Sequence, residues 1–436
     1  MSGQLCFEVL DKMFIPKNKQ SIEEIKGYTI KYGNIVDNGE VIDEVLVSYF
    51  KAPKSYTMEN MCEINSHGGN IIVKKILELC LKNGAELAEP GEFTKRAFLN
   101  GRIDLVQAES VIDIINAKSE KEVKTGIKQL EGLLSKEIAE IKQEIMDVMI
   151  NIEVSIDYPE YDVEDVANAE ITDMLDSVKK KLERLERSFD NGKVIKEGIK
   201  TAIIGKPNAG KSSLLNAILK EDRAIVTEYE GTTRDTIEEF VNINGIPLKL
   251  IDTAGIRETK DEVEKIGIAK SRETANTADL IIAIFDVSKE IDEEDLEVID
   301  FIKNKKAIII LNKMDLKAKI DENNENLKKL SGNIIKMSAL KNIGIDKLYE
   351  KITEMFNLNE INLDNENVIT NVRQKNLITK AIENVKKAKK TIEQKMPIDI
   401  VAIFIKDILE DLGKITGEVV TEDIIEEIFA NFCLGK

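Results

Sequence analysis

The sequence of 436 residues is too long for one hydrophobic core, so we expect two to four domains. Its 62 basic and 80 acidic residues give a net charge of −18. The electric field of such a protein as a whole repels RNA, so any RNA binding would need a local basic patch. Four cysteines without C-x-x-C spacing and a single histidine argue against a disulfide framework, a zinc site and a Ser-His-Asp triad. No run approaches about 18 apolar residues and the start lacks a basic segment, so we expect a cytoplasmic protein with no membrane span and no signal peptide.

The first hundred residues are predicted to form a small α+β domain. Alternating apolar runs at 28–32 and 44–50 predict strands, and residues 37–39, Asp-Asn-Gly, predict a hairpin turn. Residues 70–81 predict a helix.

A helical pattern then runs from about residue 105 to 156, and helix is predicted again over 371–395 and 401–432. Between these, aliphatic positions recur at spacings of three and four, which is typical of a bundle core and suggests no chemistry. These positions are Ile171, Leu175, Val178, Leu182, Leu185 and Phe189.

Residues 197 to about 360 alternate apolar strands with helices, which predicts a doubly wound parallel sheet. Its central motif, residues 205–212, reads Gly-Lys-Pro-Asn-Ala-Gly-Lys-Ser and matches the phosphate-loop pattern G-x-x-x-x-G-K-[ST] between a predicted strand and a predicted helix. Its two glycines let the backbone wrap a phosphate chain, Lys211 supplies a positive charge, and Ser212 is expected to hold Mg²⁺.

Three further motifs follow in the order that a GTPase requires. Residues 252–255, Asp-Thr-Ala-Gly, end a strand where a carboxylate can reach Mg²⁺ through water. Residues 312–315, Asn-Lys-Met-Asp, place Asp315 to accept two N–H groups of guanine, and residues 338–340, Ser-Ala-Leu, close the base pocket. Each motif alone is common by chance, but together with the phosphate loop they indicate GTP hydrolysis.

The group that orients the attacking water is less clear from these patterns. Thr233 is expected to be the switch threonine on Mg²⁺, but Ile256 stands where small GTPases carry a water-orienting glutamine. Asp261, Glu262 and Glu264 follow, and by pattern alone such an acidic cluster is more often a solvated surface. The residues that these motifs predict to bind GTP are Asn208, Ala209, Gly210, Lys211, Ser212, Ser213, Gly231, Thr232, Thr233, Asp252, Thr253, Ala254, Gly255, Asn312, Lys313, Asp315, Ser338, Ala339 and Leu340.

Outside these motifs, several phrases make the chain resemble the MnmE (TrmE) family of tRNA-modifying GTPases over nearly its whole length. The most specific is the twelve-residue phrase at 90–101, PGEFTKRAFLNG; the others are His-Gly-Gly at 67–69, Asp104-Leu105 with 107–109, Ile-Thr-Gly-Glu at 415–418 and Cys-Leu-Gly-Lys at 433–436. The resemblance implies a Ras-like P-loop GTPase domain (α/β) inserted into a discontinuous all-α helical domain, preceded by an N-terminal α+β folate-binding and dimerisation domain. The expected limits are 1–101 for the N-terminal domain, 102–196 and 359–436 for the two helical parts, and 197–358 for the GTPase domain.

The resemblance also implies a reaction and its partners. A homodimer, with the flavoprotein MnmG (GidA) in a heterotetramer, would add an aminomethyl or carboxymethylaminomethyl group to the wobble uridine of tRNA. One carbon would come from a tetrahydrofolate derivative, the 5-formyl or 5,10-methylene form, and potassium-dependent GTP hydrolysis would drive the process.

Site residues are carried over by motif. The family's GTP-binding switch segment maps to Thr227, Glu228, Tyr229 and Glu230. Its K⁺ site maps to Asn208, Thr227, Tyr229 and Thr232, and its water-orienting glutamate maps to Glu264. Its catalytic set here would be Glu264, Lys211, Thr233 and Cys433, with Ser212 and Thr233 on Mg²⁺. Its folate pocket maps to Glu63, Arg102 and Lys436.

One departure from the family concerns the N-terminus, where its usual first strand and Arg-x-Ser-Gly phrase have no counterpart. From this we expect weakened folate binding and an unpaired sheet margin, with the GTPase domain unaffected. Two other classes stay open: a GTP-dependent RNA-binding switch, for which we would expect a basic RNA module, and a scaffold that has lost the modification activity.

Overall fold

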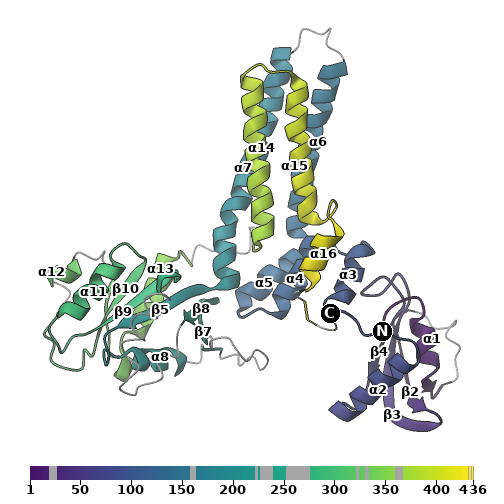
Figure 1. Ribbon diagram of the computed structural model, residues 1–436, viewed down its shortest axis with the longest axis horizontal. Coiled ribbons are helices and arrows are strands. Elements are labelled where there is room, and N and C mark those ends of the chain that lie inside the picture. Colours follow the sequence, from purple (N-terminus) through teal and green to yellow (C-terminus); the bar gives the residue numbers. More distant parts are fainter. Residues whose placement is uncertain are drawn as a thin grey trace. The chain divides into compact units, whose positions relative to one another are not determined.

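The computed structural model describes most of the chain, in two compact units (Figure 1). The described residues are 1–18, 27–157, 164–220, 224–225, 239–251, 275–320, 324–328, 333–358, 367–430, 432–433 and 435. The first unit comprises Met1–Ile112, Gln129–Leu175 and Glu383–Lys436, and the second comprises Asp113–Lys128 and Asp176–Ile382. Within the described residues, no helix combines the length and the apolar character needed to cross a membrane. The domain limits expected from the sequence stay a prediction.

The first unit begins with an antiparallel sheet whose strands follow chain order. They are β1 (Phe14–Pro16), β2 (Thr29–Asp37), β3 (Glu40–Phe50) and β4 (Met61–Asn65). Alternating residues of β3, such as Val45 and Val47, are buried in a core shared with α1 (Cys6–Asp11) and α2 (Asn70–Lys82). Asn38 and Gly39, with φ of 49° and 88°, form the two-residue turn between β2 and β3. The strands, turn and helix expected here are confirmed.

The other face of this sheet carries three exposed apolar side chains among polar ones. Ile30 and Tyr32 of β2 and Leu46 of β3 are 65%, 49% and 47% exposed. Tyr32 lies opposite Leu46, and Ile30 lies in one cross-strand row with Ser48 and Glu63. We call Ile30, Tyr32 and Leu46 the outer sheet face; contiguous exposed apolar residues of this kind mark interaction surfaces.

Long helices follow, as expected from the 3.6-residue pattern. In the first unit, α6 (Leu133–Asp157) lies beside α15 (Ile398–Thr416), and an ion pair joins Lys142 of α6 to Glu418. The two helices bury the aliphatic residues Ile138, Ile141, Ile145, Val148, Ile152, Val401, Ile405, Ile408, Leu412 and Ile415. The remaining helices are α3 (Glu92–Leu99), α4 (Leu105–Ile115), α5 (Glu120–Leu130), α7 (Glu164–Glu197), α14 (Val372–Glu393) and α16 (Glu422–Ala430). The stripe from Ile171 to Phe189 is buried on α7, which confirms that prediction.

The expectation of one helix over 401–432 is wrong at Gly417, where α15 ends. Gly417 has φ of 87°, and a Cβ there would lie 2.7 Å from Phe98 and 2.9 Å from Leu105. The chain turns in this left-handed conformation, and α16 then packs on α3, with the rings of Phe98 and Phe429 6.4 Å apart.

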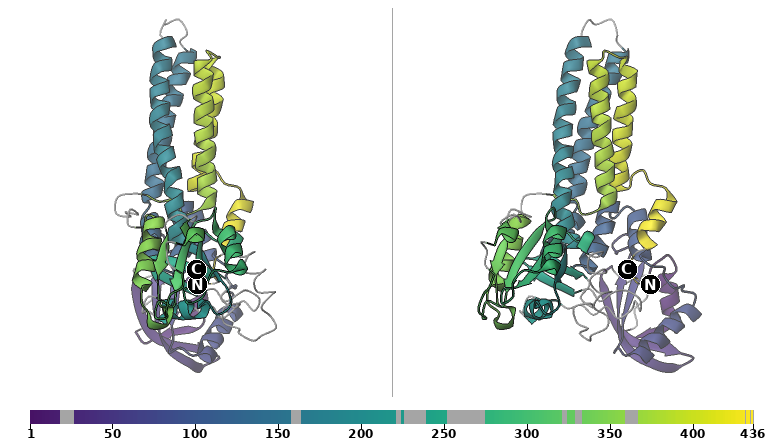
Figure 2. Two further views of the ribbon diagram at one scale, coloured as in Figure 1. Left: turned by 90° about the vertical axis from the view of Figure 1, so that its left-hand side faces the viewer. Right: turned by 60° about the vertical axis from the view of Figure 1, so that its left-hand side comes forward.

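The second unit is built on a seven-stranded sheet in the order β11-β10-β9-β5-β8-β7-β6. The strands are β5 (Ile199–Gly205), β6 (Ala224–Ile225), β7 (Glu239–Ile243), β8 (Ile246–Ile251), β9 (Leu280–Asp286), β10 (Ala307–Asn312) and β11 (Ile334–Lys336). Two apolar clusters lie on this sheet. One includes residues of α8 (Lys211–Lys220) and α13 (Ile345–Met355), and the other includes residues of α11 (Glu293–Ile302) and α12 (Glu325–Lys328). Helices therefore cover both faces, as the alternating sequence pattern predicts (Figure 2).

The sheet is mixed, however, and not wholly parallel as expected. The strands from β11 to β8 are parallel, but β7 pairs antiparallel with β8 and with β6. Asn244 and Gly245, with φ of 51° and 82°, form the tight turn that reverses the chain between β7 and β8.

The chain leaves α7 for this sheet and returns at Ile369, close to where it left. The backbone N–H of Ile369 donates to Ser188 of α7 at 3.2 Å. A Cβ at Gly192 of α7 would lie 2.0 Å from the carbonyl oxygen of Ile369, so only glycine fits. Farther along, Thr379 of α14 donates to Glu186 at 2.6 Å. These contacts close the inserted segment at its base.

A buried carboxyl lies in the part of α5 that belongs to this unit. Glu122 is 6% exposed and accepts the backbone N–H of Lys118 at 2.6 Å. Burial, with a smaller contribution from the nearby charge of Asp113, raises the pKa of Glu122 to about 7. Asp113 itself is ion-paired with Lys196 at 2.7 Å.

Candidate functional site

The phosphate loop has the backbone that its two glycines require. Gly205, the last residue of β5, has φ of 154°, and a Cβ there would lie 2.5 Å from the carbonyl oxygen of Ile284. Gly210 has φ of 108°, and its Cβ would lie 2.1 Å from Nδ2 of Asn312. Neither position has room for a side chain, so the loop can pass close to β9 and to the end of β10 before α8 begins at Lys211.

The lysine of the motif is held inside the loop. Nζ of Lys211 donates to the carbonyl oxygens of Gly205 and Lys206 at 2.7 and 2.9 Å. Ser212 and Ser213 follow in the first turn of α8, where helix N–H groups and a hydroxyl are available to phosphate and metal oxygens. The loop therefore combines a positive charge, helix N–H groups and an oxygen ligand suited to Mg²⁺.

The base-recognition segment is joined directly to this loop. Asn312 donates from Nδ2 to the carbonyl oxygen of Ala209 at 2.9 Å and accepts the N–H of Ala339 at 3.0 Å through Oδ1. Asn312 is 2% exposed, so both bonds are shielded from water. Lys313 donates to the carbonyl oxygen of Asn208 at 2.8 Å. The three expected segments, 208–213, 312–315 and 338–340, thus form one site.

The carboxylate expected to read guanine is kept ionised. The hydroxyl of Ser338 donates to Asp315 at 2.6 Å, and this bond lowers the pKa of Asp315 below its usual value. An ionised carboxylate accepts the paired N–H donors of guanine and repels the acceptor edge of adenine. Leu340, also expected at the base, is 80% exposed.

The expected K⁺ ligand Asn208 lies at the tip of the phosphate loop. Its φ is 59°, its side chain is exposed, and no side-chain hydrogen bond is recorded for it within the described part of the chain. Its amide oxygen is a suitable ligand for a hard cation. Thr227, Tyr229, Thr232, Thr233, Glu228, Glu230, Gly231, Asp252, Thr253, Ala254, Gly255, Glu264 and Lys436 lie outside the described residues. The strand β8 ends at Ile251, directly before Asp252, and runs parallel to β5, which leads into the phosphate loop.

Sequence reasoning missed a second anchor of the phosphate loop. Lys206 forms ion pairs with Asp292 at 2.5 Å and Asp295 at 2.8 Å, the two residues of the capping box that starts α11. Burial disfavours its charge, but the two carboxylates outweigh burial and raise the pKa of Lys206. The D-x-x-D spacing before an apolar run signals the cap, but nothing in it signals Lys206.

A similar ion pair fixes Lys313. Nζ of Lys313 lies 2.6 Å from Asp286, the last residue of β9. Burial works against ionisation of this carboxyl, but hydrogen bonds from Lys313 and Ser288 lower the pKa of Asp286 overall. Lys313 therefore links the ends of two neighbouring strands to the phosphate loop.

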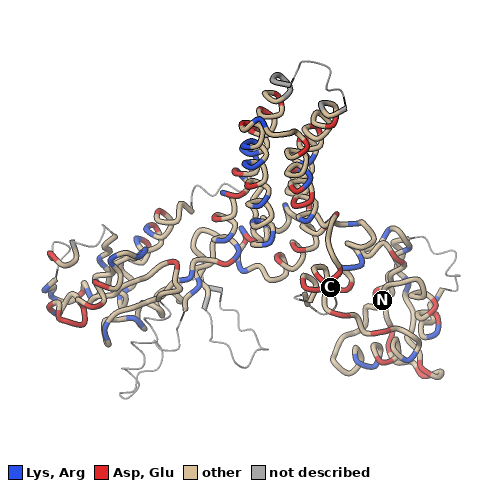
Figure 3. The backbone as a smooth tube through the Cα atoms, turned by 45° about the horizontal axis from the view of Figure 1, so that its top comes forward, with Lys and Arg blue, Asp and Glu red and all other residues tan. Residues whose placement is uncertain are grey.

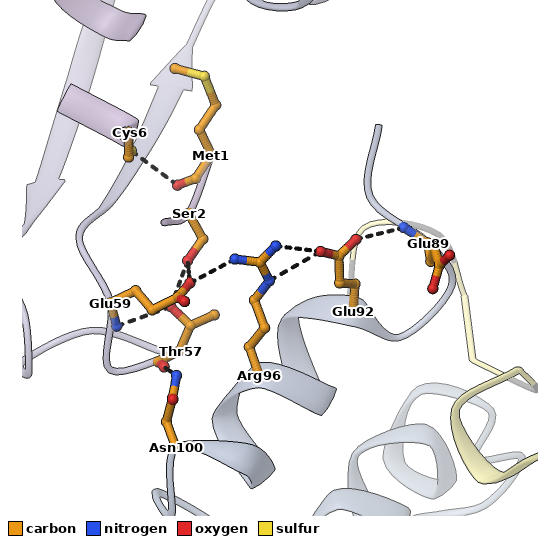
Figure 4. Close-up of polar contacts among 9 residues, drawn as sticks. All are labelled: Met1, Ser2, Cys6, Thr57, Glu59, Glu89, Glu92, Arg96 and Asn100. Carbon is orange, nitrogen blue, oxygen red and sulfur yellow. Dashed lines mark hydrogen bonds and ion pairs between the residues drawn. The ribbon is translucent and has the colours of Figure 1, made fainter. Parts of the chain in front are cut away.

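In the first unit, the phrase at 90–101 contributes mainly structural contacts (Figure 4). Arg96 on α3 donates to Glu92 at 2.5 Å and to Glu59 at 3.0 Å. Asn100 donates to the carbonyl oxygen of Thr57 at 2.6 Å, and Ser2 donates to Glu59 at 2.8 Å. The phrase thus fastens the segment between β3 and β4 to α3.

Two of the expected folate residues, Glu63 and Arg102, have different neighbours in this unit. Glu63 is exposed on β4, in the cross-strand row that includes Ile30 of the outer sheet face. The guanidinium of Arg102 lies 4.3 Å from the centre of the Tyr56 ring. No hydrogen bond or ion pair between Glu63 and Arg102 is recorded among the described residues. Cys433 is exposed, and its carbonyl oxygen accepts the N–H of Gly91 at 3.3 Å, which brings Cys433 to the start of the 90–101 phrase.

Comparisons with known proteins show which family this chain belongs to. Residues 1–102 match the family described as "GTP-binding protein TrmE N-terminus", and residues 105–433 match "MnmE helical domain". The chain is 50% identical over 437 residues to the tRNA modification GTPase MnmE of Clostridioides difficile (strain 630), covering 100% of this chain and 95% of the relative. It is 49% identical over 438 residues, with the same coverage, to the protein of that name from Alkaliphilus oremlandii (strain OhILAs). Among solved structures, the G domain of the T. maritima FeoB iron transporter is 29% identical, covers 36% of this chain and 97% of its own, and has a TM-score of 0.27.

Proposed function

Since this chain belongs to the MnmE family of tRNA modification GTPases, we propose that it hydrolyses GTP to drive modification of the wobble uridine of tRNA. The observation that carries the hydrolysis is the joining of the phosphate loop to residues 312–315 and 338–340 by the two bonds of Asn312. The relatives' name carries the tRNA substrate. We place the activity in the cytoplasm, where tRNA and GTP are available.

The described residues fit GTP and Mg²⁺. The loop N–H groups and Lys211 bind the phosphates, Asp315 selects guanine, and the hydroxyl of Ser212 is the described ligand for Mg²⁺. Bound Mg²⁺ offsets the charge that develops on the β- and γ-phosphates. Thr233 as the second Mg²⁺ ligand and Glu264 as the residue that orients the water complete the proposal.

We further propose that K⁺ takes the place of an arginine finger. Asn208 would hold it together with Thr227, Tyr229 and Thr232, next to the β- and γ-phosphates. The exposed position of Asn208 supports this proposal, because a second GTPase domain could approach the ion from the solvent side.

The N-terminal domain is proposed to form the homodimer and to bind a tetrahydrofolate derivative. The outer sheet face supports dimerisation, since its apolar residues are exposed in one chain. Glu63 lies in the same cross-strand rows, so a folate held by Glu63, Arg102 and Lys436 would lie next to that interface. The exposed thiol of Cys433 lies on the same C-terminal motif as Lys436.

The partner in this proposal is the flavoprotein MnmG, in a heterotetramer. Within it, the one-carbon unit of the folate and an amine would build the aminomethyl or carboxymethylaminomethyl group on the uridine. GTP hydrolysis would change the conformation of the complex and would not take part in that bond formation.

The first test measures GTP hydrolysis in Mg²⁺ buffer with KCl and then with NaCl at equal ionic strength. We expect roughly tenfold or greater stimulation by K⁺, and we expect N208G to lose it. Glycine tolerates the φ of 59°, so the variant removes the ligand without straining the loop. N38G, at an exposed turn with φ of 49°, is the matched control and should keep the stimulation. Equal rates in both salts would refute the K⁺ site but leave the GTPase assignment standing.

A further inference from the structure

The helix α14 is strongly basic in a chain of net charge −18 (Figure 3). Of its 22 residues, seven are basic and two are acidic. The basic residues are Arg373, Lys375, Lys380, Lys386, Lys387, Lys389 and Lys390, and the acidic residues are Glu383 and Glu393. The negative net charge of the protein repels nucleic acid, so RNA binding requires a local basic surface. The basic residues of α14 provide such a surface.

Three of these lysines share one exposed face of the second half of α14. Lys386, Lys387 and Lys390 are exposed, while their neighbours Val385 and Ala388 are fully buried. Residues three and four apart lie one above the other on a helix, so the three ammonium groups project from adjacent turns of one side. We call these three residues the lysine face.

The lysine face forms no ion pair within the described residues. No ion pair is recorded for Lys386 or Lys390 there, and Lys387 donates only to the amide oxygen of Asn384, at 3.1 Å. Lys386 and Lys387 lie four and three residues before Lys390, and like charges at these spacings repel one another. The two carboxylates of the helix, Glu383 and Glu393, lie at similar spacings from these lysines and offset part of that repulsion. An anionic partner would relieve that repulsion.

The composition of the face favours nucleic acid over protein as that partner. Protein interfaces centre on buried aromatic or aliphatic anchors and are depleted in lysine. On α14, all of whose residues are described, the exposed large apolar residue is Val372, at the opposite end of the helix from the lysine face. Lysines without apolar anchors suit a sugar-phosphate backbone, where the contact is electrostatic and independent of base sequence.

We propose that the lysine face of α14 binds the phosphate backbone of the tRNA substrate. The inference rests on the proposed function for the identity of the RNA. Its contribution to affinity is electrostatic: each phosphate neutralised releases counterions, so binding should weaken steeply as salt rises. The face positions the tRNA and takes no part in choosing its sequence.

The test measures binding of a fluorescently labelled, unmodified tRNA transcript to the full chain by anisotropy, over a series of salt concentrations. The triple variant K386Q/K387Q/K390Q is compared with a control of equal charge change made at exposed lysines on other elements, K124Q/K303Q/K347Q. Glutamine has nearly the helix propensity of lysine, so α14 should stay helical. We expect the α14 variant to lose about tenfold or more in tRNA affinity, and the control to change much less. The slope of the logarithm of the binding constant against the logarithm of the salt concentration should be shallower by about two in the α14 variant.

GTP hydrolysis without tRNA separates this inference from the proposed function. It should be unchanged in both triple variants, because neither removes a residue of the nucleotide site. Equal tRNA affinity in wild type and the α14 variant, or equal loss in both variants, would overturn the lysine face and leave the GTPase assignment intact. Loss of binding to the flavoprotein with unchanged tRNA affinity would also overturn it, in favour of a protein partner. If the wild-type chain hydrolyses GTP but binds no tRNA, the proposed role of the lysine face is wrong and the GTPase assignment stands.

Discussion

Replacing Glu122 by glutamine should stabilise the second unit at neutral and alkaline pH but not at acid pH. Glu122 has a pKa of about 7 in the folded chain against 4.5 for the free side chain. A raised folded pKa means that the folded state holds the proton more tightly, so stability is full below about pH 4.5 and is lost as the pH rises through about 7. Glutamine keeps an oxygen for the N–H of Lys118 and cannot ionise, so E122Q avoids this loss.

The size of the effect follows from the shift. At 1.36 kcal/mol per pKa unit, 2.5 units correspond to at most about 3.4 kcal/mol at pH 8. A domain of 150–250 residues changes its melting temperature by roughly 2–4 °C per kcal/mol, so the upper limit is roughly 7–14 °C. At pH 5 the difference should fall to about 0.8 kcal/mol, or roughly 2–3 °C, because Glu122 is still protonated in the folded state and only the unfolded side chain is ionised.

Differential scanning calorimetry between pH 5 and pH 8 measures this difference, and the transition of the second unit is the one that added guanine nucleotide raises. E120Q on the same helix is the control, since Glu120 is exposed and its replacement should give a small difference that does not vary with pH. A difference between E122Q and wild type that is the same at pH 5 and pH 8 would refute the burial argument.

Three further predictions concern the nucleotide site. G210A should weaken GTP binding by roughly 100-fold or more in a nucleotide titration, because its Cβ would displace Asn312, whereas G39A, with no atom within 4 Å of the added Cβ, should bind normally. D315N should lose roughly 100-fold or more in affinity for guanine nucleotide but bind xanthine nucleotide better, because its amide donates where xanthine has an acceptor. A competition assay with both nucleotides measures this, and equal losses for both bases would contradict the role of Asp315. K206M should raise the KM for GTP several-fold by releasing the phosphate loop from its two carboxylates, and K206R should restore much of it; an unchanged KM in K206M would show that the ion pairs do not position the loop.

The nucleotide site could be predicted from the sequence because its motifs are contiguous and each constrains its own backbone. Gly205 and Gly210 stand at two positions of unusual φ that leave no room for a side chain, and Asp315 stands at the fixed position that the motif gives to the guanine-binding carboxylate, so residue type and spacing together predict the site. Strands and helices were predictable where burial follows a period, as in β3 and α7.

What the sequence did not reveal depends on residues far apart along the chain. Lys206 meets Asp292 across 86 positions, and the end of α15 at Gly417 depends on Phe98 in another helix. The antiparallel edge of the sheet is an exception, because a local signal, the Asn-Gly pair at 244–245, marks it in the sequence and the alternation of strands and helices alone does not. The lysine face has a sequence signal, a run of lysines at helical spacing, but its exposure is a property of the packed bundle.

Ile369 contacts Ser188 and Gly192 where the inserted segment begins and ends. This contact determines how freely the length of the inserted segment can vary. The helices on either side of the insertion are held together at its base, so for the rest of the chain the segment is a loop with fixed ends. The entropy of closing a loop grows only with the logarithm of its length, by about 0.6 kcal/mol for each doubling. Lengthening or shortening the segment between those ends, or exchanging it for another compact domain, therefore costs the helical bundle little. The contacts among Ser188, Gly192 and Ile369 fix the two ends of the insertion, whichever domain lies between them.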